Sequence, residues 1–139
     1  MNWENTTPEW VPTRGCTMRK TGLFFDAVRI PGAFGSKVAA TLGASNGGEA
    51  GPVIGELLGK RWLYFVLPVG TVSEFQWPLE VERYSRMTPN AVSFIGIPAL
   101  EGDTWPLFWF SRPTADQPYV DPALLHAAVL AQAEADTHA

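Results

Sequence analysis

The stretch LFFDAVRI, residues 23–30, is followed by Pro31 and decides the fold of this chain. Its length and its apolar and aromatic content predict a β-strand that the proline brings to an end. Side chains alternate between the two faces of a strand, so Asp26 shares a face with Val28 and Ile30. One face of the predicted strand therefore carries a carboxylate among large apolar groups.

The later elements, in chain order, are predicted as a helix over 33–42, strands over 52–58, 61–69, 92–97 and 107–111, and a helix opening at Asp121-Pro122. In the first helix Phe34, Val38 and Leu42 fall on one stripe, and Gly43 is a suitable C-terminal stop. The strands over 52–58 and 61–69 are separated by a short turn and predict an antiparallel hairpin. Residues 62–67 have no polar side, so we expect that strand to be central and covered on both faces.

These elements predict an α+β fold. It has a mainly antiparallel sheet, a helix after the first strand and a C-terminal helix packed on the sheet. We expect one domain over residues 23–131, between an N-terminal arm with few regular elements over 1–22 and a frayed tail over 132–139. Asp121 is a good N-cap before Pro122, which marks the start of the last helix.

Composition narrows the class of protein. The chain has 139 residues, of which 46% are hydrophobic, 12% aromatic and 17% charged, as expected of a globular domain. Its formal charge of −4 opposes non-specific nucleic-acid binding, which depends on Lys and Arg. The longest apolar run, residues 62–67, is far shorter than the roughly 20 residues that span a membrane. With a start that does not look like a signal peptide, we expect a soluble cytoplasmic protein without membrane contact.

Three residues near the first strand are candidates for ligand binding: Asp26, Arg29 and Lys37. The segment over 32–37 lies where the predicted strand turns into the predicted helix, and backbone N–H groups at a helix start could hold a phosphate there, with Lys37 adding charge. The spacing is not that of a Walker loop, however, so an ordinary turn with a solvated lysine is the simpler interpretation. Asp26 lacks a second acid two positions on, where Val28 stands, so a carboxylate bonded to backbone or to an arginine is favoured over a two-metal site.

No complete catalytic or metal set emerges from the sequence. Cys16 is the single cysteine, and the two histidines are His126 and His138. Nothing in the sequence places Cys16 or a serine beside His126, as a nucleophilic dyad or triad requires. We therefore assign no catalytic residue, metal ligand or cofactor, and an enzyme is less favoured than a binding protein.

Two groups of side chains are candidates for contact with a macromolecule. Arg14, Arg19 and Lys20, downstream of Trp3 and Trp10, could contact a nucleic-acid backbone and stack on bases, although a solvated arm is favoured. The second group is the aromatic cluster Trp105, Phe108, Trp109 and Phe110. It could belong to the core, but alternation exposes half of a one-sided strand, so a hydrophobic interface competes with that interpretation.

Three segments, residues 22–31, 51–54 and 62–71, resemble small actinobacterial proteins grouped with the bifunctional DNA primase/polymerase N-terminal-like domains. The closing residues 120–125 are also similar. Primase-polymerases carry paired acids on one strand and a downstream histidine, whereas here Val28 stands at the partner position and no histidine precedes His126. The resemblance therefore implies a relative that does not polymerise and that binds nucleotides or nucleic acid.

The aromatic excess without a catalytic set favours a non-enzymatic binding or regulatory module. It would act through an aromatic surface on a protein partner or on a second copy of itself. The alternative is the nucleotide- or nucleic-acid-binding relative, which needs its cations on one concave face: Arg14, Arg19, Lys20, Arg29 and Lys37. A third possibility, an enzyme working through Asp26, needs a pocket around that carboxylate.

Overall fold

The computed structural model describes residues 7–85 and 93–137. Its elements, in chain order, are β1 (Cys16–Lys20), β2 (Asp26–Ile30), α1 (Gly32–Ser45), β3 (Val53–Glu56), β4 (Leu63–Leu67), the 3-10 helix η2 (Val72–Glu74), β5 (Glu82–Tyr84), β6 (Phe94–Pro98), β7 (Leu107–Ser111) and α2 (Pro122–Thr137). The strands pair antiparallel, and α1 directly follows β2. The α+β fold class is therefore confirmed.

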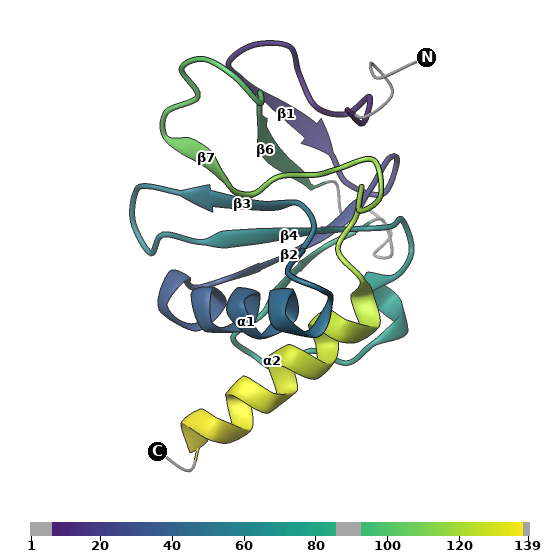
Figure 1. The fold of residues 1–139 in the computed structure, drawn as a ribbon, viewed down its shortest axis with the longest axis vertical. Helices are drawn as coiled ribbons and strands as arrows, with labels where there is room; N and C mark the ends of the chain where they lie inside the picture. The colour runs from purple at the N-terminus through teal and green to yellow at the C-terminus, as the bar shows by residue number, and fades with distance from the viewer. Residues whose placement is uncertain (1–6, 86–92, 138–139) are drawn as a thin grey trace.

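The strands form two sheets. The larger has five strands in the order β5-β2-β4-β3-β7, and the smaller pairs β1 with β6. The predicted hairpin is the antiparallel pair of β3 and β4, and β4 is the central strand, as expected. The small sheet lies over one side of the large sheet, and both helices lie on the other side (Figure 1). The molecule therefore has a helical layer, a central sheet and a second, smaller sheet.

Each face of the five-stranded sheet has its own core, because the side chains of β2 and β4 alternate between them. On the helical side Val28 and Phe65 pack with residues of both helices, including Val38 of α1 and Leu125 of α2. On the opposite side, the residues packed together are Trp10, Val11, Phe25, Ala27, Ile54, Val66, Ile95 and Ile97. The alternation predicted for β2 is confirmed by this division.

The expectation of an N-terminal arm with few regular elements needs correction, because β1 lies within residues 1–22. β1 pairs with β6, in a register that sets Cys16 opposite Pro98. Trp10 is only 2% exposed, and its ring packs on Phe25 with centroids 5.2 Å apart. The pairing is invisible in local sequence because its two strands are distant along the chain.

Several predicted boundaries shift. Helix α1 passes Gly43 and ends at Ser45, because the stop is made further on, where the N–H of Gly48, at φ +92°, donates to the Gly43 carbonyl. Helix α2 continues to Thr137, so residues 132–137 of the expected frayed tail are helical. Strand β7 has the predicted bounds. The predicted strand over 92–97 corresponds to β6, and its residue 92 lies outside the described residues.

Candidate functional site

Asp26 closes into the core instead of opening into a pocket. It is 1% exposed, and its Oδ2 accepts hydrogen bonds from the backbone N–H groups of Gly70 (2.9 Å) and Val72 (3.2 Å). Its other oxygen, Oδ1, is buried without a hydrogen-bond partner. Burial raises the pKa of the carboxyl, against the lowering by the Val72 and Gly70 N–H groups. The carboxylate fastens the chain that leaves β4, which is the structural interpretation favoured by the sequence.

Arg29 is engaged by protein side chains. Its Nη2 lies 2.7 Å from Oε1 of Glu82, and its guanidinium carbon lies 3.9 Å from the centre of the Trp62 ring. Nη1 also donates to the hydroxyl of Tyr64 at 3.3 Å. Lys37 is exposed on α1, on the other side of the five-stranded sheet. The three candidate ligand-binding residues are therefore not brought together.

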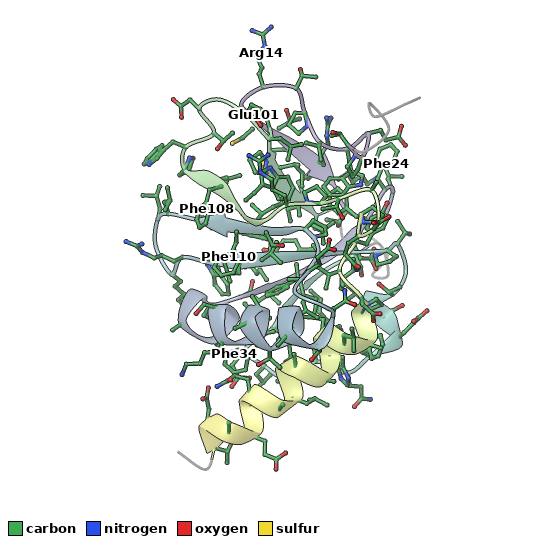
Figure 2. The ribbon with its side chains drawn as sticks, in the orientation of Figure 1. Arg14, Phe24, Phe34, Glu101, Phe108 and Phe110 are labelled. Atoms are coloured by element: carbon green, nitrogen blue, oxygen red, sulfur yellow. The ribbon has the colours of Figure 1, made fainter. Side chains whose placement is uncertain are left out.

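The basic residues of the N-terminal segment also lie apart from Lys37. Arg14 is exposed in the loop before β1, and Figure 2 shows it on the opposite side of the large sheet from α1. Arg19 donates through Nε to the carbonyl of Trp10 at 3.1 Å, so it holds the N-terminal segment in place. Lys20 is exposed at the end of β1. These cations do not share the single concave face that the nucleic-acid alternative requires.

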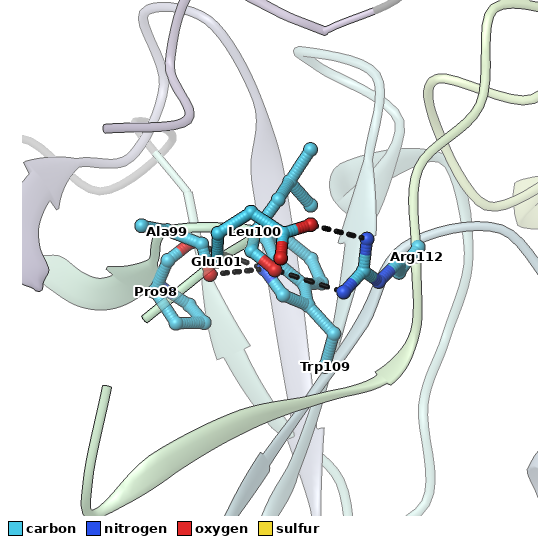
Figure 3. Close-up of polar contacts among 6 residues, drawn as sticks. All are labelled: Pro98, Ala99, Leu100, Glu101, Trp109 and Arg112. Atoms are coloured by element: carbon cyan, nitrogen blue, oxygen red, sulfur yellow. Dashed lines mark hydrogen bonds and ion pairs between the residues drawn. The ribbon is translucent and has the colours of Figure 1, made fainter. Parts of the chain in front are cut away.

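The predicted aromatic interface is divided among three environments. Trp109 packs in the core between the sheets, and its Nε1 donates to the carbonyls of Pro98 and Ala99, both at 3.1 Å (Figure 3). Phe108 and Phe110 line a hollow on the helical side of the sheet. Trp105 is 64% exposed in the loop before β7 and lines a different hollow. Alternation along β7 explains why neighbouring aromatic residues separate in this way.

The hollow beside Trp105, of about 350 Å³, lies where the small sheet meets the ends of β3, β4 and β7. We call it the Trp105 hollow. Its lining residues are Cys16, Thr17, Met18, Glu56, Tyr64, Phe94, Ile95, Gly96, Trp105, Pro106 and Leu107. Three of its large apolar side chains are unusually open to solvent: Met18 is 62% exposed, Phe94 47% and Trp105 64%. A gathering of exposed apolar side chains of this kind marks an interaction site.

One end of the hollow is polar. The hydroxyl of Tyr64 donates to Oε1 of Glu56 at 3.4 Å and accepts from Nη1 of Arg29. Burial raises the pKa of Tyr64, so the hydroxyl keeps its proton at neutral pH. The thiol of Cys16 donates to the carbonyl of Thr104 at 2.9 Å, and burial raises its pKa. Cys16 is therefore a protonated thiol at neutral pH, not an activated nucleophile.

The loop that carries Trp105 is fixed to its surroundings. The carbonyl of Pro106 accepts from the N–H of Leu57 at 2.9 Å, which ties the loop to β3. Arg112, which follows β7, donates to the carbonyl of Leu100, which precedes the loop, at 2.8 Å (Figure 3). Such anchoring holds the exposed indole in place before any ligand arrives, which lowers the entropic cost of binding.

Two further hollows of comparable size lie in the described part of the chain. One, of about 420 Å³, lies between the start of α1 and the β3–β4 turn and includes Lys60, Arg61, Phe108 and Phe110; Glu56 borders both this hollow and the Trp105 hollow. The other, of about 280 Å³, lies beside Trp10 and Tyr119. Asp26 lines neither of them, nor the Trp105 hollow. The pocket that an enzyme working through Asp26 would need is therefore not among these three.

Sequence reasoning identified Trp105 but missed Met18, Phe94 and Glu56. Met18 stands opposite Gly96 in the β1–β6 pair, where a methyl group would come within 2.7 Å of Leu107. The small glycine keeps the floor of the hollow open. The sequence of β1, CTMRK, carries no apolar alternation that would have indicated a strand with Met18 on its outer face.

Comparison with known proteins found no protein-family model, curated protein or solved structure that matches this chain. The resemblance to primase-polymerase-like domains therefore stays a prediction. Residues 7–85 and 93–137 contain no group of three or more His, Cys, Asp or Glu side chains that could hold a metal ion. No helix in the same part of the chain is long and apolar enough to cross a membrane.

Proposed function

We propose that this chain is a non-enzymatic binding module that takes up a segment of a partner protein in the Trp105 hollow. The observation that carries the proposal is the exposure of Met18, Phe94 and Trp105 around one hollow, at 62%, 47% and 64%. Burying such side chains contributes roughly 25 cal/mol per Å² of apolar surface removed from water. Tryptophan is also among the residues that most often dominate the energy of protein interfaces.

The openness of these walls favours a protein segment over a small molecule. Small-molecule sites usually enclose most of the ligand's surface. Here two of the apolar walls, Met18 and Trp105, are more than half exposed, and the loop carrying Trp105 is anchored by the Leu57–Pro106 hydrogen bond. A fixed, protruding aromatic side chain beside a shallow hollow suits a partner that covers it from outside.

Chemistry inside the hollow supports binding without catalysis. Its thiol, Cys16, has a raised pKa, and no histidine is among its lining residues. His126 lies elsewhere, with Nε2 2.9 Å from the carbonyl oxygen of Gln76; its ring is tilted against Phe75 and meets Trp77 edge to face. A histidine base that would activate a nucleophile is therefore absent from the lining of the hollow.

Titration with the neutral blocked peptide acetyl-Leu-Gln-Phe-amide, followed by two-dimensional NMR, tests this proposal. We expect the largest shift changes at Met18, Phe94 and Leu107. Trp105→Ala should weaken binding by about fivefold or more, the loss expected for a central aromatic anchor. Phe110→Ala is the matched control, because this exposed aromatic residue lines a different hollow. Equal weakening by both variants, or no shift changes around Trp105, would contradict the proposal.

A further inference from the structure

Glu56 is the one carboxylate among the residues that line the Trp105 hollow. It is partly buried at the end of β3, and its carboxylate accepts a 3.4 Å hydrogen bond from the hydroxyl of Tyr64. Within the described ranges no Lys or Arg lies at ion-pair distance from it. Arg29 contacts the same Tyr64 hydroxyl as Glu56, but its guanidinium is already paired with Glu82. Glu56 therefore has no salt-bridge partner among the described residues, although Lys60 and Arg61 line the neighbouring hollow that it also borders.

Covering this carboxylate with an apolar partner would cost free energy, because a charge loses its hydration without gaining a counter-charge. The cost falls when the partner supplies a cation. Asp103, which also acts electrostatically on Cys16, adds a second negative charge near the same hollow. With one carboxylate and no Lys or Arg among its lining residues, the hollow favours a positively charged group.

From this we infer that the segment bound in the Trp105 hollow carries a lysine or arginine side chain, whose charged group meets Glu56 while a neighbouring apolar residue covers Trp105 and Met18. The inference rests on the function proposed above. The aliphatic stem of a lysine or arginine suits apolar walls, and its charged end suits the polar end of the hollow. The indole of Trp105 adds a surface that attracts cations. The hydroxyl of Tyr64 holds Oε1 of Glu56 at that end.

Three blocked peptides of equal length test the inference: acetyl-Leu-Lys-Phe-amide, acetyl-Leu-Gln-Phe-amide and acetyl-Leu-Glu-Phe-amide. With the unmodified chain we expect the lysine peptide to bind about three- to tenfold more tightly than the glutamine peptide, and the glutamate peptide to bind most weakly. The advantage of lysine should shrink as the salt concentration rises. These comparisons need no variant, so they do not depend on how a substitution affects folding.

The variant Glu56→Gln should bring the affinities for the lysine and glutamine peptides close together. Glu134→Gln is the matched control: it removes one charge from an exposed position on α2, on the other side of the large sheet, and should leave the ratio unchanged. Equal binding of all three peptides to the unmodified chain would overturn the inference but leave the proposed function standing. If none of the peptides bound, the proposed function would fail as well.

Discussion

Oδ2 of Asp26 accepts a hydrogen bond from the backbone N–H of Gly70 at 2.9 Å, and this contact fastens the chain that leaves β4 to the first residue of β2. The same oxygen accepts from Val72, the first residue of η2. The carboxylate that lies inside the predicted strand over 23–30 thus holds the sheet and the following turn together. The proposed binding surface lies elsewhere, on the side of the sheet that carries β1 and β6.

Replacing Asp26 should affect stability more than binding. Asp26→Ala leaves the N–H groups of Gly70 and Val72 without their acceptor, which should lower the free energy of unfolding by about 1–3 kcal/mol. Asp26→Asn keeps an oxygen acceptor and should lose less. Urea denaturation of the two variants measures the difference. An alanine variant as stable as the unmodified chain would show that these hydrogen bonds do not hold the turn.

Asp26 should make the free energy of unfolding depend on pH. Burial raises the pKa of this carboxyl in the folded chain above its ordinary value of 3.8. The folded state therefore holds the proton more tightly than the unfolded state, and this contribution to stability is lost as the pH rises from about 4 through the folded-state pKa. Asparagine does not titrate, so the free energy of unfolding of Asp26→Asn should rise relative to that of the unmodified chain as the pH increases over this range. Parallel pH curves for the two proteins would contradict the prediction.

Arg29 should stabilise the sheet through its stacking as well as its charge. Arg29→Lys removes the planar guanidinium over Trp62 and the two contacts that Nε and Nη2 make with Oε1 of Glu82. We therefore expect the free energy of unfolding to fall by about 1 kcal/mol. Arg83→Lys, at an exposed position of neighbouring β5, is the control and should change little. Urea denaturation measures both variants. The interpretation fails if the two substitutions have the same effect.

The exposed apolar side chains should also make the chain associate with itself at high concentration. Sedimentation velocity from micromolar to millimolar protein should show a sedimentation coefficient that rises with concentration, because solvent-exposed apolar patches promote association. Trp105→Ala should flatten this rise, and Phe110→Ala should not. A coefficient independent of concentration in the unmodified chain, or one that responds equally to both variants, would speak against an interface at Trp105.

Elements that depend on local pattern were predictable from the sequence. The alternation in β2, the hairpin of β3 and β4, the bounds of β7 and the N-cap at Asp121 follow from neighbours along the chain. The partner of β1 could not be predicted, because its pairing with β6 joins distant segments and β1 itself has a polar sequence. Alternation predicted that the aromatic residues of β7 face different sides of the sheet, but only the fold shows that Phe108 and Phe110 line a hollow while Trp109 packs between the sheets.

The candidate site was accessible to sequence reasoning only through Trp105. Met18, Glu56 and Phe94 come from β1, β3 and β6, and none of them stands in a motif. Their meeting depends on how the small sheet crosses the ends of the large one, which is a property of tertiary packing. Conversely, Asp26 and Arg29 attracted attention as charges in an apolar strand, and the structure shows both engaged in contacts within the protein.

Intermolecular nuclear Overhauser effects between this chain and acetyl-Leu-Lys-Phe-amide would test the central claim most directly. We expect contacts from the phenylalanine ring of the peptide to the methyl groups of Met18 and Leu107 and to the indole protons of Trp105, all of which line one hollow. Contacts to Phe108 or Phe110 on the helical side of the sheet, in place of those at Trp105, would contradict the account.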